Sequence, residues 1–232
     1  MIVDSLVFAA DGLLEALDAA GIDRAVVCPP RARGHGYDVV NDRVAELARS
    51  HPDRLVGFAR VDPLAPGAAA ELERSLGLGL RGLFLHPWED AFAIADPAVD
   101  PLIGEVPVIV ATGYPWVSEG LQVGELARRH PQTTVVATNG AQINISGLGQ
   151  RDALLALEAN PNLLIQTTGV YREDFLEGVV ERFGPARVLF ASGWPRFDPR
   201  LELLRVEWAP GLDDDARTAI LHDNAASLLG LA

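Results

Sequence analysis

The chain has 232 residues, of which 49% are hydrophobic and 22% charged, and its 19 basic residues face 32 acidic ones for a formal net charge of -13. This composition is typical of a globular protein with ample apolar material for one large core. All the basic residues counted are arginines, which excludes lysine Schiff-base chemistry. The excess of acids argues against nucleic acid or anionic lipid as a partner.

The predicted strands are short apolar or β-branched runs that recur along the whole chain. Several are continuously apolar, as in Val106–Val110, which is typical of strands buried on both faces of a sheet. In chain order we predict strands over Ile2–Phe8, Ala25–Cys28, Leu55–Val61, Gly82–His86, Val106–Ala111, Thr134–Thr138, Leu163–Thr167 and Arg187–Ala191.

Helical patterns lie between these strands. They repeat apolar residues at helical spacing, and Ser118 is the expected N-cap of one of them. The predicted helices are Asp11–Ala20, Asp38–Arg49, Glu119–Arg129, Asp174–Phe183 and a last helix from Asp213 to Leu229.

Eight strands alternating with helices predict an α/β protein with a parallel sheet. A closed barrel and an open doubly wound sheet both fit this alternation. The first turn, Phe8–Gly12, lacks the glycine-rich pattern that usually marks a nucleotide site in the open sheet. We therefore expect residues 1–232 to form one (β/α)8 TIM barrel, with some distortion allowed, whose site lies at the carboxyl ends of the strands.

Cellular location is predicted from what the sequence lacks. Cys28 is the single cysteine, so no internal disulfide is expected. The first residues lack a basic signal-peptide region, and no apolar run approaches the ~20 residues that cross a bilayer. We expect a cytoplasmic protein without a membrane partner.

A series of short motifs also runs through the chain in a fixed order. They are Asn41–Arg43, His51–Gly57, Val61–Pro63, Gly82–Pro87, Pro107–Gly113, Arg187–Pro195 and Asn224–Ala226. Taken together, they resemble the second amidohydrolase family, which includes decarboxylases of the aminocarboxymuconate-semialdehyde type and dicarboxylate lactonases. One motif is a weak signal, but the ordered series covers nearly the whole chain.

The resemblance implies a metal centre of known design. In that family the first strand ends in a His-x-His pair, and one His follows each of strands five and six. An Asp after strand eight serves as ligand and proton shuttle. Strand alternation sends the paired imidazoles to one face. The bound divalent ion lowers the pKa of water or polarises a carbonyl.

This sequence departs from the family at every ligand position. Two replacements are bulky and apolar, two offer no functional side chain, and one is a neutral amide. They are Leu6, Phe8, Ala111, Gly193 and Asn139. We predict no metal and no cofactor, and we expect Leu6 and Phe8 to fill the vacated volume. Metal-ligand side chains left around an empty centre would be unpaired polar groups in a dry site, which cost ~1–3 kcal/mol each.

His86 is the best remaining acid–base candidate, since it ends the fourth strand. The alternative is a framework histidine that is hydrogen-bonded beneath a loop. Asp4 points to the interior by strand alternation, and Arg60 near the end of strand three is a candidate for the partner that its buried carboxylate needs. That pair would either bind substrate or brace the barrel as a buried ion pair.

Two further groups of side chains are expected at the mouth. Asn139, Gln142 and Asn144 follow strand six, where amides would stabilise an oxyanion or cap a polar loop. Trp88, Tyr114, Trp116 and Trp194 follow strand ends, where they would form an apolar pocket for a planar or lipophilic ligand or pack within loops. The loop over residues 31–37 would be a lid or a solvated loop.

Three functions remain open. The first is a metal-independent hydrolase, lactonase, cyclase or decarboxylase that uses His86, Asp4, Arg60 and Asn139 on a small carbonyl or aromatic substrate. The second is a non-catalytic protein that binds a small molecule or a partner protein. The third is a metal-dependent hydrolase with relocated ligands. A small molecule is the expected partner, and a homo-oligomer is left open.

Overall fold

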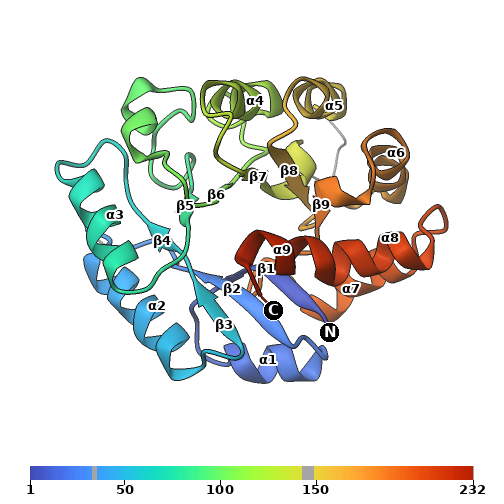
Figure 1. The fold of residues 1–232 in the computed structure, drawn as a ribbon, viewed down its shortest axis with the longest axis horizontal. Helices are drawn as coiled ribbons and strands as arrows, with labels where there is room; N and C mark the ends of the chain where they lie inside the picture. The colour runs from blue at the N-terminus through green and yellow to red at the C-terminus, as the bar shows by residue number, and fades with distance from the viewer. Residues whose placement is uncertain (33–35, 143–148, 232) are drawn as a thin grey trace.

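The computed structural model describes residues 1–32, 36–142 and 149–231. Its short parallel strands form an inner ring, and its helices surround that ring (Figure 1). The strands are β1 Val3–Phe8, β2 Arg24–Cys28, β3 Leu55–Gly57, β4 Ala59–Arg60, β5 Leu83–Leu85, β6 Val108–Val110, β7 Val135–Ala137, β8 Leu163–Gln166 and β9 Val188–Leu189.

A helix follows most of the strands, and the helices other than α9 pack on the outside of the ring. They are α1 Leu13–Ala19, α2 Asp38–Ser50, α3 Ala68–Gly77, α4 Gly120–Arg129, α5 Gln150–Ala159, α6 Glu173–Phe183, α7 Pro199–Glu207, α8 Asp214–Thr218 and α9 Asn224–Leu229. The single-turn segments are η1 Pro97–Leu102, η2 Thr138–Ala141, η3 Pro185–Arg187 and the π-helical η4 Ala219–Asp223. Among the described residues, no helix has the length and apolar character that crossing a membrane requires.

Two parallel sheets, β1-β2-β3 and β4-β5-β6-β7-β8-β9, make up the ring. They meet at Phe58, whose backbone N–H bonds to Val27, while the next residue, Ala59, bonds to Gly82. One predicted strand, Leu55–Val61, thus changes partners partway along. At the other seam, the backbone N–H of Ser5 bonds to Phe190, and other bonds pair Gly193 with Leu6 and Phe8 with Trp194.

Each predicted strand is present, although most are shorter than the apolar runs that predicted them. The predicted helices are present as well, and the last one is divided by the π-helical turn η4. The predicted N-cap of α4 was wrong by one residue, because Glu119 forms a reciprocal capping box with Gln122 while Ser118 is buried. Helices α3, α5 and α7 were not predicted.

Apolar side chains form two concentric layers that meet at the strands. The outer layer packs strand residues such as Val27 and Val110 against the helices. The inner layer fills the barrel with residues such as Leu6, Phe84 and Ala111, and α9 adds Ala225 and Leu229 to it. This double burial explains why the strand runs are continuously apolar.

Candidate functional site

A small cavity lies at the barrel centre, at the carboxyl ends of the strands. Its volume is about 20 Å³, which suits about one water molecule because a buried water needs roughly 10–15 Å³. All five positions at which the family resemblance expected a metal ligand line this cavity: Leu6, Phe8, Ala111, Asn139 and Gly193. The motif series therefore identified five positions that the fold brings together.

The side chains around this cavity do not fit a divalent ion. Asn139 is the only amide among the five replaced positions, and its Nδ2 donates to the Thr112 carbonyl at 2.7 Å. Phe8 packs edge-on against Phe84, with ring centroids 5.5 Å apart. Across the described ranges, no group of three or more His, Cys, Asp or Glu side chains is arranged to hold a metal ion. Carbon and one amide occupy positions where a metal site would need imidazole and carboxylate.

His86 follows β5 directly and lines the central cavity, with 1% of its surface exposed. Its Nδ1 accepts from the backbone N–H of Glu89 at 3.3 Å, and its Nε2 lies 3.4 Å from Glu89 Oε1 and 3.5 Å from the Tyr114 hydroxyl. Burial lowers the pKa of His86 to about 3, against the opposing effect of the Glu89 carboxylate. A neutral, buried imidazole of this kind is a poor acid–base catalyst near neutral pH.

Arg60 is fully buried, and its partners differ from the predicted one. Its guanidinium binds Asp90 through Nε and Nη2 at about 3.0 Å and Glu89 through Nη2 at 2.8 Å. It also lies over the ring of Tyr37, 5.0 Å from the centroid. The prediction that Arg60 pairs with Asp4 was wrong, because the loop after β5 supplies two carboxylates nearer to the guanidinium.

Asp4 is buried in the seam between the first and last strands. Its Oδ1 accepts from the backbone N–H groups of Leu6 and Ser192, both at 3.0 Å, while its Oδ2 has no hydrogen-bond partner among the described residues. Burial raises the pKa of Asp4 to about 7, and contacts with Ser192 and Leu6 oppose the shift. The pairing of β1 with β2 is irregular between Asp4 and Val7, and the interior orientation of Asp4 expected from strand alternation stays a prediction.

The aromatic residues do not gather around one mouth as predicted. Trp88 and Tyr114 stack with ring centroids 5.8 Å apart and planes 10° apart. Trp116 is 81% exposed, and Trp194 packs against the outer layer, away from the barrel interior. Gln142 is buried just after η2. Asn144 and residues 33–35 of the suggested lid lie outside the described residues.

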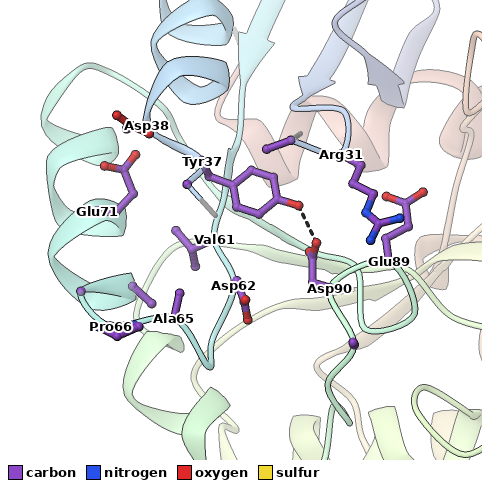
Figure 2. A pocket seen from close by; sticks show the side chains of 15 residues that line it. Arg31, Tyr37, Asp38, Val61, Asp62, Ala65, Pro66, Glu71, Glu89 and Asp90 are labelled. Atoms are coloured by element: carbon purple, nitrogen blue, oxygen red, sulfur yellow. Dashed lines mark hydrogen bonds between the residues drawn. The ribbon is translucent and has the colours of Figure 1, made fainter. Parts of the chain in front are cut away.

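A second, much larger cavity opens beside the centre, and we call it the rim cavity (Figure 2). Its volume is about 790 Å³. The loops after β2, β4 and β5 and the first residues of α2 and α3 enclose it. Its charged and aromatic lining residues are Arg31, Tyr37, Asp38, Asp62, Glu71, Glu89 and Asp90.

The rim cavity was not predicted from the sequence, although part of its signal was visible. Asp62, Glu89 and Asp90 each follow a predicted strand within a few residues, which places them at the end of the barrel that carries sites. Asp62 also forms a turn, in which its Oδ1 accepts from the backbone N–H of Leu64 at 3.0 Å. The missing information was that three separate loops enclose one space.

Ion pairing gives the inner wall of the rim cavity a fixed arrangement. Asp90 accepts a hydrogen bond from the Tyr37 hydroxyl (Figure 2) and others from Arg60, and burial raises its pKa. Burial also acts to raise the pKa of Glu89, but His86 and Arg60 outweigh it and hold that pKa below its ordinary value. Glu89 is therefore an anion that faces both the cavity and the barrel interior.

The chain is similar to known proteins both in sequence pattern and in fold. The family model described as Amidohydrolase matches residues 3–231. No curated protein matches this chain. Among solved structures, an uncharacterized TIM-barrel protein from Bordetella bronchiseptica is 23% identical, with a TM-score of 0.76 over 96% of this chain and 83% of that one.

Two enzymes share the fold at lower identity. The 4-oxalomesaconate hydratase from Rhodopseudomonas palustris is 17% identical, with a TM-score of 0.74 over 99% of this chain and 96% of the hydratase. A dihydroxybenzoic acid decarboxylase from Polaromonas, solved with bound manganese and the inhibitor 2-nitroresorcinol, is 18% identical, with a TM-score of 0.73 over 96% and 86% of the two chains. With a family match along nearly its entire length and a ring of parallel strands like theirs, the chain belongs to the amidohydrolase family.

Proposed function

We propose that this protein is a non-catalytic member of its family that binds a small molecule in the rim cavity and has no metal at the barrel centre. One observation carries the proposal. The five positions expected to hold the family's ligands line a cavity of about 20 Å³, which is too small for a metal, its water and a substrate together. The Polaromonas decarboxylase, by contrast, was solved with bound manganese and an inhibitor.

The rim cavity has the size and chemistry of a ligand site. Small-molecule pockets usually measure ~300–1,000 Å³ and combine apolar walls with a few fixed polar groups. This cavity, at about 790 Å³, lies at the end of the barrel where sites form. Tyr37, Asp90 and Arg60 hold one another in place along its wall, so binding would require little ordering of side chains.

A metal-independent enzyme is the second candidate, and one observation favours it. His86, Asn139 and Tyr114 all line the central cavity, so a polar constellation would become available if the centre opened. The pKa of His86 near 3 argues against proton transfer in the closed form. Relocated metal ligands are the least supported hypothesis, given the donor sets in the described residues.

Metal analysis tests the first part of the proposal. Protein purified without chelator, and again after incubation with zinc or manganese and desalting, should contain far less than one equivalent of either ion. Melting temperature should not rise when zinc or manganese is added, because an ion that binds only the native state stabilises it. A stoichiometric ion at the barrel centre would refute a metal-free site.

Ligand screening with a cavity-filling variant tests the second part. Compounds that raise the melting temperature should lose much of their effect in Ala65→Trp, because Ala65 lines the rim cavity and the indole would occupy part of it. Leu64→Trp is the matched control, since the adjacent Leu64 is 52% exposed and is not a lining residue. Compounds that bind both variants equally would place the ligand site elsewhere.

A further inference from the structure

Glu89 links the lining of the rim cavity to the lining of the central cavity. It lines the rim cavity, and it contacts His86 and Arg196, which both line the central cavity. Arg60 is a third partner. The Glu89 carboxylate therefore has two guanidinium groups and one imidazole on its barrel side. The side chain of Glu89 keeps 25% of its surface exposed, so a solute in the rim cavity can reach it.

The two oxygens of Glu89 are held with unequal strength. Oε2 accepts from Arg60 Nη2 at 2.8 Å, inside the barrel wall. Oε1 lies 3.4 Å from His86 Nε2 and 3.7 Å from Arg196 Nη2, which are longer than good charge-assisted hydrogen bonds. The side chain of Arg196 is also 48% exposed. The Oε1 contacts are thus the ones a competing cation would replace first.

Those weaker contacts help to close the barrel centre. Besides facing Glu89, Arg196 donates to the Tyr114 hydroxyl through Nη1 at 3.3 Å. The ring of Tyr114 in turn lies against His86, with centroids 5.2 Å apart. Arg196 and Tyr114 both line the central cavity, so moving Arg196 away removes part of the wall that separates His86 from solvent.

We propose that Glu89 couples the two cavities, so that a small organic cation in the rim cavity engages Oε1, releases Arg196 and opens the barrel centre to solvent. The inference rests on the proposed role of the rim cavity as a ligand site. The expected charge of the ligand follows from the described residues, where five lining carboxylates outnumber Arg31 in the lining and the paired Arg60 and Arg74 behind it. The five are Asp38, Asp62, Glu71, Glu89 and Asp90. A concave surface with charge of one sign raises the local concentration of the opposite charge.

The variant Glu89→Gln tests whether loss of the Glu89 carboxylate opens the barrel centre or leaves it closed. The two outcomes predict opposite shifts of the His86 pKa. In a barrel that stays shut, losing the carboxylate lowers that pKa further, since Glu89 acts to raise it. In a barrel that opens, water hydrates the imidazole and removes the burial that lowers its pKa. The His86 pKa then rises from about 3 toward its ordinary value of 6.5. Titration of ¹⁵N-histidine-labelled protein by NMR, with His86→Gln to assign the signal, measures the shift.

Arg196→Gln supplies a second test if Glu89→Gln fails to fold, because it changes an exposed side chain. We expect His86 to become reactive toward diethyl pyrocarbonate in this variant and to remain unmodified in the wild type. Glu105→Gln is the control, because Glu105 is exposed and lines neither cavity, and it should leave the titration unchanged. A His86 that stays shielded in both test variants would overturn the coupling.

Benzamidine hydrochloride, compared with sodium chloride at equal ionic strength, tests the ligand half. Its planar amidinium suits a carboxylate, so adding it to the wild type should shift the His86 signal in the direction seen for Glu89→Gln. No shift with benzamidine, in a protein whose variants do open, would overturn the cationic ligand. The benzamidine result does not depend on metal content. Failure of the cationic-ligand proposal is therefore distinct from failure of the proposal that the barrel centre holds no metal.

Discussion

The barrel centre and the rim cavity share one end of the same barrel, yet they have opposite character. The centre is lined largely by apolar groups such as Leu6 and Phe8 and encloses about 20 Å³, whereas the rim encloses about 790 Å³ and carries five carboxylates. Polar groups in a dry interior need partners, and an unsatisfied one costs about 1–3 kcal/mol. At the rim, solvent and Arg60 supply those partners, so charged side chains are tolerated there.

Enlarging the centre should reduce stability more than any change at the rim. Leu6→Ala removes a side chain that is 3% exposed and leaves a dry void, so we expect a loss of about 2–5 kcal/mol in unfolding free energy. Urea denaturation monitored by circular dichroism measures it. Leu64→Ala, at an exposed position on the rim side, should change stability by less than about 0.5 kcal/mol. Equal losses would erase the contrast between a packed centre and an open rim.

The two buried ionisable groups should affect stability in opposite directions as pH changes. Asp4 has a raised pKa of about 7, so its contribution is complete below about pH 4 and is lost as pH rises toward 7. His86 has a lowered pKa of about 3, so its contribution is complete above pH 6.5 and is lost as pH falls toward 3. Between about pH 4 and 6.5 the two slopes should nearly cancel.

Single variants expose each slope. In Asp4→Asn, unfolding free energy should rise with pH across that window by up to about 1.4 kcal/mol per pH unit, the value for one proton. In His86→Gln it should fall with pH by a similar amount. Urea titrations at half-unit pH steps measure both, and parallel pH profiles for the two variants would contradict this assignment of the pKa values.

Weakening the rim wall should have the smallest effect. Tyr37→Phe removes the hydroxyl that donates to Asp90 but leaves the ring that lies against Arg60. Asp90 keeps its bonds to the guanidinium, so we expect a loss of about 1 kcal/mol or less in unfolding free energy, measured by the same urea denaturation. A loss as large as that of Leu6→Ala would mean that the rim network, like the centre, is part of the stabilising core.

Much of the fold could be predicted from local patterns. Apolar runs alternating with helical spacing indicated the strands and the barrel, because burial on both faces leaves a continuous apolar signature. The motif order placed Leu6, Phe8, Ala111, Asn139 and Gly193 at equivalent strand ends, and the structure brings all five to one cavity. Helices α3, α5 and α7 were missed even though they complete the outer layer.

Only tertiary structure decided the partners of the buried charges. Asp4 and Arg60 are both buried, but the backbone N–H of Ser192 bonds to the first, and the loop after β5 brings Glu89 and Asp90 to the second. The rim cavity arises in the same way, since three loops distant in sequence enclose it. The sequence determined which residues are buried in strands, because burial selects residue type locally; which charges meet depends on how distant loops are brought together.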